Sequence, residues 1–256
     1  MTTPLLTATN LSKNFGGVAA VNNITLDVFE GETLAIIGPN GAGKTTFYNM
    51  LSGRMPPSSG TIRFKNQDIT GLPPHQISRL GISRSFQINN IFTEMTVREN
   101  VEVAISALQG DSRKWFNIAT KNHSVQQQAD ALLEQLGLTH LTHHRAGIIS
   151  YGDKRLVEIA VVLATKPELV LLDEPTAGMT PGETRQVTAL IHQLSKTGQY
   201  TFVITEHDMN VVFDVAHRIL VMHRGQNLAL GTPEMVKQNT DVRKAYLGEE
   251  IEEELA

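Results

Sequence analysis

The sequence contains no cysteine. A chain without cysteine forms no disulfide, offers no thiolate ligand to a metal ion and has no thiol nucleophile. Long apolar stretches are also lacking, since the runs 159–164 and 169–172 are far shorter than the roughly 20 residues of a membrane-spanning helix. We therefore expect that any role at a membrane depends on a partner chain.

An excess of positive charge is missing as well. The formal net charge is -4 at pH 7, and the 256 residues include no block rich in lysine and arginine, so nothing predicts a nucleic-acid groove. The chain starts without the charged and then apolar segment of an export signal, which favours a cytosolic location. A hydrophobic content of 41% is enough for a sizeable core in one domain, with or without a smaller lobe.

The sequence does contain the phosphate-binding pattern G-x-x-x-x-G-K-[ST], placed between an apolar run and a helix-like stretch. Its residues are Gly38, Pro39, Asn40, Gly41, Ala42, Gly43, Lys44 and Thr45, followed by Thr46 at the start of the helix-like stretch 46–51. Glycines let backbone N–H groups turn towards phosphates, Lys44 can reach the outer phosphates, and the Thr45 hydroxyl can ligate Mg²⁺. The pattern predicts a nucleoside triphosphate site, although a chance glycine-rich turn also fits so short a pattern.

Strand and helix patterns place this loop in an α/β fold. Short β-like runs separated by turns are expected at 6–11, 24–29, 33–38 and 61–65. A helical pattern over 96–135 interrupts them and predicts an inserted helical lobe. Beyond it, strand-like runs at 169–172 and 201–205 alternate with helix candidates at 181–194 and 209–215, which is the order of a parallel α/β sheet.

Asp173 and Glu174 directly follow the apolar run 169–172, at the carboxyl edge of the predicted parallel sheet, where ligands bind. Neighbouring side chains there point to opposite sides of the sheet. We expect Asp173 to hold Mg²⁺ through water, and Glu174 to accept a proton from, or orient, the water that attacks the γ-phosphate. A solvated acidic turn before Pro175 is the alternative interpretation of the pair.

The segment ISYGDK begins another predicted helix. Ser150 stands at its N-cap, and Asp153 stands at the position where a capping box has its acidic residue. By itself, this segment indicates no more than a well-capped helix.

These motifs together resemble a known family. In order and spacing they resemble the motifs of the nucleotide-binding cassette of ABC transporters. The motifs are the loop GPNGAGKT, the glutamine of SFQ, the segment ISYGDK, the run LVLLDEP and the histidine of TEH. The resemblance implies an α/β P-loop NTPase fold with a RecA-like core, an antiparallel β subdomain and an inserted α-helical subdomain. It implies a single nucleotide-binding domain over 1–256, with the helical subdomain at about 90–165. The acidic run at 249–256 is expected to be a solvated tail.

The resemblance also implies the ligands ATP and Mg²⁺ and a role for single residues. Phe15 is implied to stack on adenine, although a phenylalanine before Gly16 also fits a core anchor. Gln87 is implied to touch Mg²⁺ and the attacking water, and to lie at the contact with a membrane subunit. His207 is implied to contact the γ-phosphate, a role that suits a ring able to donate a hydrogen bond in either protonation state.

A head-to-tail dimer of two cassettes is a further implication of the resemblance. Ser150 and Gly152 would present the start of their helix to the γ-phosphate bound by the opposite protomer, so that ATP joins the two chains. Hydrolysis at Glu174 would then weaken the closed dimer, and the change in binding would be coupled to movement elsewhere.

The chain departs from the family pattern at two places. The usual LSGGQ is ISYGD here, so Tyr151 replaces a glycine and Asp153 adds a negative charge. Thr180 stands where the family often has the aspartate of Ser-Ala-Leu-Asp, and it offers only a neutral hydroxyl. The effect of these departures on ATP affinity and turnover stays open at this point.

The same departures resemble one subgroup. The chain resembles cassettes of branched-chain amino-acid uptake systems at four places. These are SYG in the segment ISYGD, which corresponds to the family's LSGGQ signature, AGM-T-P after the acidic pair, TEHDM around His207 and the ending AYLG at 245–248. That resemblance implies integral-membrane permeases, a second ABC ATPase subunit in a homo- or heterodimer and, indirectly, a periplasmic or extracellular solute-binding protein, with no nucleic acid. It implies a peripheral position on the cytoplasmic face of the inner (plasma) membrane.

Other functions remain as alternatives. Cassettes for urea or other small solutes, and for lipopolysaccharide export, look similar, and no residue of this chain identifies the solute. A soluble ABC ATPase of DNA repair or translation would carry heptads, cysteines or a second set of motifs, none of which occurs here. His140, His143 and His144 suggest a metal site, but they lack cysteines or carboxylates at ligand spacing, so we interpret them as solvated loop residues.

Overall fold

A six-stranded, mostly parallel sheet forms the centre of the molecule. The computed structural model of the chain describes residues 3–85, 91–108 and 123–245. The strand order is β10-β9-β3-β8-β7-β6, and β10 runs antiparallel to β9. The strands are β3 (Thr33–Ile37), β6 (Ile82–Arg84), β7 (Leu169–Asp173), β8 (Thr201–Thr205), β9 (Arg218–His223) and β10 (Gln226–Gly231).

The strands β3, β7 and β8 lie inside this sheet and are covered on both faces. Every residue of the three strands is buried, which explains why their sequences are continuous apolar runs rather than alternating patterns. Successive side chains point to opposite faces. In β3, Ala35 and Ile37 belong to one hydrophobic core, and Leu34 and Ile36 belong to the other. The sheet therefore separates two cores.

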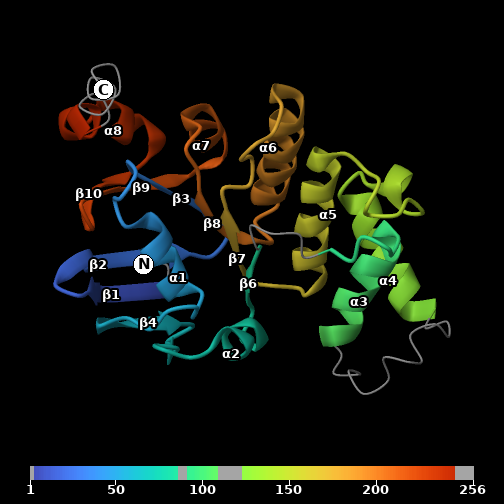
Figure 1. Cartoon of the computed structure of the whole chain (residues 1–256), viewed down its shortest axis with the longest axis horizontal. Helices are drawn as coiled ribbons and strands as arrows, with labels where there is room; N and C mark the ends of the chain where they lie inside the picture. Colours follow the sequence, from blue (N-terminus) through green and yellow to red (C-terminus); the bar gives the residue numbers. More distant parts are fainter. Residues whose placement is uncertain (1–2, 86–90, 109–122, 246–256) are drawn as a thin grey trace.

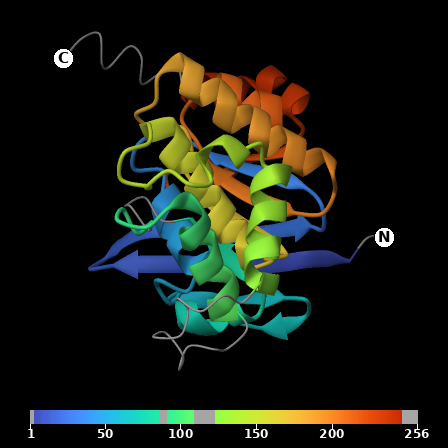
Figure 2. The ribbon, with the colours of Figure 1, turned by 90° about the vertical axis from the view of Figure 1, so that its right-hand side faces the viewer.

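Helices cover one face of the central sheet (Figure 1). α6 lies beside α7 over the sheet, α5 follows, and α3 and α4 stand beyond α5 at the far end of the molecule (Figures 1 and 2). α5 packs against α3, α4 and α6, so it joins the outer pair to the centre. The bounds are α3 (Val97–Leu108), α4 (His123–Gln135), α5 (Tyr151–Ala164), α6 (Pro181–Lys196) and α7 (Met209–Val215), with the 3-10 turn η2 (Thr139–Leu141) after α4.

The other face carries α1 (Lys44–Leu51) and a second, antiparallel sheet of order β2-β1-β4-β5. Phe47 and Tyr48 of α1 are completely buried in the core between the two sheets. The antiparallel strands are β1 (Pro4–Phe15), β2 (Val18–Phe29), β4 (Ser59–Phe64) and β5 (Gln67–Asp68). The short helix α2 (Pro74–Arg79) lies beside β6 and packs Ile77 into the same core. The other short helix, α8 (Pro233–Gln238), lies beside β9 and β10 and packs Val236 into the core on the helical face.

Most of the predicted elements are confirmed. The runs at 169–172 and 201–205 form β7 and β8, and the candidates at 181–194 and 209–215 form α6 and α7. β1 and β2 are longer than predicted because bulges let the two strands continue as one hairpin. The predicted helical lobe contains α3 and α4, with 109–122 outside the described residues. Its separate subdomain bounds at 90–165 stay a prediction, and the tail at 249–256 lies outside the described residues.

Candidate functional site

The carboxyl ends of β3, β8 and β7 meet at one edge of the central sheet. Thr205 at the end of β8 stands opposite Ile36 on one side and opposite Asp173 on the other. The loop 38–43 and the acidic pair are therefore separated only by β8. The Thr205 hydroxyl donates a hydrogen bond to Asp173 Oδ1, at the end of the neighbouring strand β7, at 2.6 Å. Parallel sheets bind their ligands at this edge.

Two glycines of the loop 38–43 occupy positions where no side chain fits. Gly38 has a φ of 151°, and a Cβ there would lie 2.1 Å from the carbonyl oxygen of Met222. Gly43 has a φ of 97°, and a Cβ there would lie 2.2 Å from the carbonyl oxygen of Ala20. The loop is pressed against neighbouring backbone on both sides, which fixes its path between β3 and α1.

Lys44 begins α1, and its side chain folds back over the loop. The residue is only 7% exposed. Its Nζ donates to the carbonyl oxygens of Gly38 and Pro39, the latter at 3.0 Å. The ammonium is thus held above the loop by weak neutral acceptors, which phosphate oxygens can replace with stronger charge-assisted bonds. Thr45 is exposed and Thr46 half-buried at the same helix start.

A cavity of about 410 Å³ opens in front of the loop. It is lined by Phe15, Ala20, Asn40, Gly41, Ala42, Gly43, Lys44, Thr45, Thr46, Glu174 and His207. Residues far apart in the sequence and predicted to serve one nucleotide are therefore brought to one place. Phe15 is 46% exposed at the end of β1, with Lys13 Nζ 5.4 Å from its ring centroid, so the ring is available for stacking rather than buried as a core anchor.

Glu174 has an unusual backbone conformation for a residue with a side chain. Its φ is 44°, and its N–H donates to the carbonyl oxygen of Thr205 at 3.0 Å. Residues held in this left-handed region cluster at functional sites. The turn leaves the carboxylate at the cavity, where Glu174 Oε1 lies 2.9 Å from His207 Nε2. The base and the histidine predicted from the sequence therefore contact each other directly.

Asp173 is buried and forms an ion pair that the sequence analysis did not predict. Its Oδ2 accepts a hydrogen bond from Arg84 Nη2 at 2.7 Å. Arg84 Nη1 also donates to Asn49 Oδ1 at 2.7 Å and to Ser52 Oγ at 2.8 Å. The guanidinium lies over the Tyr48 ring, 4.6 Å from its centroid, and burial followed by the charge of Asp173 raises the pKa of Tyr48 well above its ordinary value. The only feature of the sequence that could have pointed to Arg84 is its position directly before the motif SFQ.

Arg155 ties α5 to the end of β7, and it too was missed. Its Nη2 donates to the carbonyl oxygen of Asp173 at 2.9 Å, and its Nε donates to that of Pro175 at 3.2 Å. Nη1 pairs with Glu158 at 2.8 Å one turn along the same helix. The helix α5, which begins at the segment ISYGDK, is therefore hydrogen-bonded to the backbone of the segment that carries the acidic pair.

The start of α5 confirms the predicted cap. Ser150 is the N-cap, and its hydroxyl accepts a hydrogen bond from the N–H of Asp153 at 3.1 Å. Ser150 and Gly152 lie outside the described lining of the loop cavity, so within one chain they do not complete it. The N–H of Gly152 donates instead to Glu183 Oε1 of α6 at 2.8 Å. Gln87, the other predicted site residue, lies outside the described residues.

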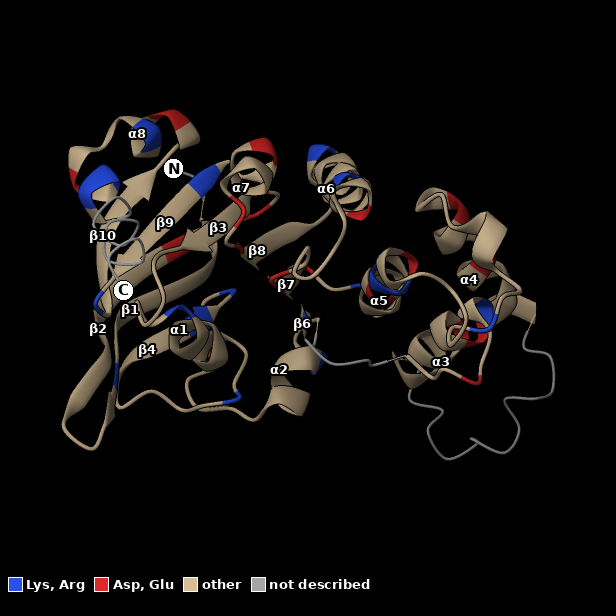
Figure 3. Ribbon diagram, turned by 45° about the horizontal axis from the view of Figure 1, so that its top comes forward, with Lys and Arg blue, Asp and Glu red and all other residues tan. Residues whose placement is uncertain are grey.

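Basic and acidic positions are interspersed over the helices and strands in Figure 3. Among the described residues, no helix has the length and apolar character needed to cross a bilayer. Within the same residues, no group of three or more histidine and acidic side chains is arranged to hold a metal ion. His140, His143 and His144 are all exposed.

Similarity to known sequences is extensive. The sequence model of the ABC transporter family matches residues 21–177, and that of the branched-chain amino acid ATP-binding cassette transporter matches residues 226–252. The chain is 43% identical to the high-affinity branched-chain amino acid transport ATP-binding protein LivG of Escherichia coli strain K12, over 97% of this chain and 100% of that protein. It is 41% identical to BraF of Pseudomonas aeruginosa, which has the same description, over 97% and 100% of the two chains.

Solved structures share the fold. An ATP-binding cassette of an ABC transporter in its ADP conformation is 33% identical, with a TM-score of 0.84 over 96% of this chain and 100% of that one. A nucleotide-free cassette is 32% identical, with a TM-score of 0.82 over 95% and 99%. The predicted fold class and ATPase activity are confirmed. The chain belongs to the ABC transporter family, as an ATP-binding cassette that hydrolyses ATP to drive transport.

Proposed function

We propose that this chain hydrolyses Mg-ATP to power the uptake of branched-chain amino acids through separate membrane permeases. The observation that carries the solute class is similarity over the full length to LivG and BraF, whose descriptions name branched-chain amino acid transport. The match of the C-terminal family model to residues 226–252 supports the same class independently of the ATPase motifs.

ATP fits the cavity in front of the loop 38–43. Phe15 offers an exposed ring to the adenine, and residues 40–46 line the cavity at the start of α1, where the N-terminal end of a helix favours phosphates. Lys44 exchanges the carbonyl oxygens of Gly38 and Pro39 for oxygens of the outer phosphates. The chain thus holds its lysine in place before the nucleotide arrives.

Mg²⁺ suits the oxygen donors beside this loop. The exposed Thr45 hydroxyl can ligate the ion directly, while Asp173, whose oxygens already accept bonds from Arg84 and Thr205, fits contact through a bound water. Gln87 is proposed as the third contact. When bound, the ion neutralises charge that develops on the phosphates.

Hydrolysis is assigned to Glu174 and His207. Glu174 orients the attacking water and accepts its proton, because its carboxylate faces the cavity at the end of β7. His207 Nε2 lies 2.9 Å from that carboxylate and lines the same cavity, so its ring can hold the carboxylate in place and can donate its hydrogen bond to the γ-phosphate instead once the nucleotide is bound. The strained turn at Glu174 keeps the two side chains together.

A second cassette completes the site. Ser150 and Gly152 lie outside the described lining of the cavity in their own chain, so they suit the γ-phosphate held by an opposing protomer, in a homo- or heterodimer. ATP then binds two surfaces at once, and its hydrolysis releases one of them. A solute-binding protein would act indirectly, on the far side of the permeases, while this chain sits peripherally on the cytoplasmic face of the inner membrane.

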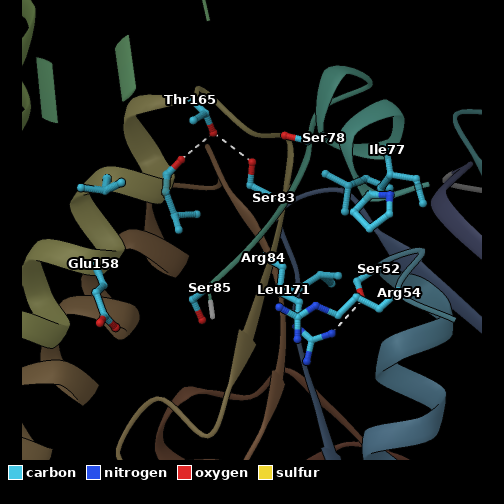
Figure 4. Close-up of a pocket in the computed structure, with 14 residues that line it drawn as sticks. Ser52, Arg54, Ile77, Ser78, Ser83, Arg84, Ser85, Glu158, Thr165 and Leu171 are labelled. Atoms are coloured by element: carbon cyan, nitrogen blue, oxygen red, sulfur yellow. Dashed lines mark hydrogen bonds between the residues drawn. The ribbon is translucent and has the colours of Figure 1, made fainter. Parts of the chain in front are cut away.

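A groove of about 220 Å³ beside β6 is proposed as the permease contact (Figure 4). It lies between α2 and α5, with Ile77 and Leu171 in its apolar wall and Arg54 and Glu158 among its charged residues. The groove is next to the entry to 86–90, where Gln87 is expected to meet a membrane subunit. An apolar floor with charged groups around it suits an amphipathic segment of a partner.

The absence of cysteine makes this contact testable with a single introduced thiol. Ser78→Cys in the groove should cross-link to a permease when membranes containing the transporter are treated with a short bifunctional thiol–amine reagent. Gln199→Cys, an exposed position in the turn before β8, is the matched control. Equal cross-linking of both positions, or of neither, would reject the groove as the contact.

The solute class is tested by transport. Disruption of the gene in the source cell should abolish high-affinity uptake of radiolabelled leucine, isoleucine and valine. The wild-type chain should restore uptake, and the Glu174→Gln chain should not. Unchanged amino-acid uptake together with lost urea uptake would replace the proposed solute and leave the ATPase assignment standing.

A further inference from the structure

A carboxylate joins the start of α5 to the start of α6. Glu183 Oε1 accepts a hydrogen bond from the N–H of Gly152 at 2.8 Å. Glu183 Oε2 accepts from the N–H of Thr180 at 3.0 Å and from its hydroxyl at 2.8 Å. Both oxygens are therefore engaged, one with the signature segment and the other with the segment that follows the acidic pair. We call this set of contacts among Gly152, Thr180 and Glu183 the cis clasp.

The cis clasp requires a glycine at position 152. A Cβ there would lie 2.6 Å from Glu183 Cγ and 2.8 Å from Glu183 Cβ, distances that real side chains do not reach. The glycine is thus demanded by a neighbour in the same chain, whatever its role towards a second protomer.

Two of the residues that depart from the usual family motifs lie at or beside the cis clasp, Thr180 within it and Tyr151 next to Gly152. Thr180 replaces an aspartate, and its hydroxyl is 2.8 Å from the Glu183 carboxylate. An aspartate there would place a second negative charge beside Glu183 and repel it. Tyr151 replaces a glycine, and its hydroxyl lies 3.5 Å from the carbonyl oxygen of Ala177, which adds a second, weaker contact between the same two segments.

The N–H of Gly152 has one hydrogen to donate. Under the proposed function, that hydrogen goes to the γ-phosphate of the opposing protomer in the closed dimer. A carboxylate and a phosphate are both anionic acceptors, and a single N–H does not serve both with full-strength bonds. In this structure the acceptor is Glu183.

We propose that Glu183 is a positioning residue that occupies the signature N–H of Gly152 in the ATP-free chain and releases it to the partner's γ-phosphate when the dimer closes. This inference rests on the proposed function, because it assumes that Gly152 faces ATP across a dimer. Closure then exchanges one anion for another, so ATP competes with a carboxylate built into the chain. The contact sets how much ATP is needed to close the dimer.

The charge state of Glu183 agrees with this role. The N–H and then the hydroxyl of Thr180, followed by the N–H of Gly152, lower the pKa of the Glu183 carboxyl from its ordinary value of 4.5. The side chain is consequently a carboxylate at neutral pH, as a competitor of phosphate must be.

The chain contains a matched control for the loss of a helix cap. At the start of α3, Glu99 Oε2 accepts from the N–H of Thr96 at 2.7 Å and from its hydroxyl at 2.9 Å. This is the same reciprocal pattern as at Thr180 and Glu183, but without a contact to the signature segment. Glu99→Ala therefore removes equivalent capping chemistry and leaves Gly152 untouched.

The first measurement is amide exchange in the ATP-free full-length chain. Glu183→Ala should speed exchange of the Gly152 N–H by about tenfold or more, because its acceptor is gone, whereas Glu99→Ala should not change it. Glu183→Gln keeps a neutral acceptor and should give a smaller increase, which guards against a folding defect in the alanine variant. Equal Gly152 exchange in the wild type and both Glu183 variants would overturn the proposal.

The second measurement is ATPase activity of the complete transporter in lipid nanodiscs as a function of ATP concentration. Glu183→Ala should lower the KM for ATP by about three- to tenfold with little change in kcat, since the competing acceptor has been removed. Glu99→Ala should leave both constants unchanged. A KM that stays the same or rises in Glu183→Ala would overturn the competition.

A wild-type complex without ATPase activity would reject the proposed function and the competition, while slow exchange of the Gly152 N–H would still demonstrate its contact with Glu183.

Discussion

Arg84 and Asp173 form an ion pair with 2.7 Å between Nη2 and Oδ2, and their side chains are only 8% and 5% exposed. Arg84 ends β6, Asp173 ends β7, and the guanidinium also binds Asn49 of α1 and Ser52, the residue that caps the end of α1. One side chain thereby joins the edge strand, the strand of the acidic pair and the helix that follows the phosphate loop. It also lines the groove that we assign to the permease, so that groove and the Asp173 carboxylate share a residue (Figure 4).

Arg84→Ala should lower the free energy of unfolding by about 3–5 kcal/mol, because it leaves the buried Asp173 carboxylate without its cation. Urea denaturation followed by circular dichroism measures the loss. Arg98→Ala is the matched control, since Arg98 makes a two-pronged bond to Asp130, with 2.7 Å in each arm, but at 28% and 44% side-chain exposure. That variant should lose about 1 kcal/mol or less. Similar losses in the two variants would contradict the importance of burial at Arg84.

Glu174→Gln should reduce ATP hydrolysis by about a hundredfold or more while nucleotide binding persists, because the proton acceptor is lost and the phosphate contacts remain. Turnover and ATP affinity are measured on the same purified complex. Glu168→Gln is the control, as Glu168 precedes the amino end of the same strand and pairs with Lys65 away from the cavity. Hydrolysis at the wild-type rate in Glu174→Gln would exclude Glu174 as the catalytic base.

Local sequence patterns were sufficient to locate the phosphate loop and the acidic pair at the ends of their strands. Each combines an apolar strand with polar residues directly after it, and burial of β3 and β7 on both faces made those strands easy to recognise. The strand β6 was missed because a run of three residues carries no usable period. Its arginine was missed with it.

Contacts between residues far apart in the sequence could not be predicted from such local patterns. Arg84 reaches Asp173 across 89 positions, and Gly152 reaches Glu183 across 31. Such partners are chosen by the packing of strands and helices, which spacing along one chain does not reveal. The departures of Tyr151 and Thr180 from the family motifs were visible in the sequence, but only the fold shows that their two segments contact each other, through Tyr151 with Ala177 and Gly152 with Glu183.

Phe15→Ala should weaken ATP binding by about 1–3 kcal/mol, the usual contribution of a base stacked on an aromatic ring. Isothermal titration calorimetry with ATP measures the change, and Phe15→Tyr should preserve most of the affinity. Phe92→Ala is the matched control, because Phe15 and Phe92 are both 46% exposed and Phe92 is not part of the cavity lining. Unchanged affinity in Phe15→Ala would leave the ring as a packing residue.

Acid should open the cis clasp only below the ordinary range of carboxyl titration. The folded-state pKa of Glu183 is lowered from 4.5, so its contacts contribute fully above that unfolded value and are lost as the pH falls through the lower folded value. The amide chemical shift of Gly152 in the ATP-free chain should therefore be constant from about pH 7 to pH 5 and change below pH 4.5. The amide of Gly147 donates to the carbonyl oxygen of Thr93 and should show no such step. A Gly152 transition centred above pH 4.5 would mean that these hydrogen bonds do not stabilise the carboxylate, and an absent transition would mean that Gly152 does not contact it in solution.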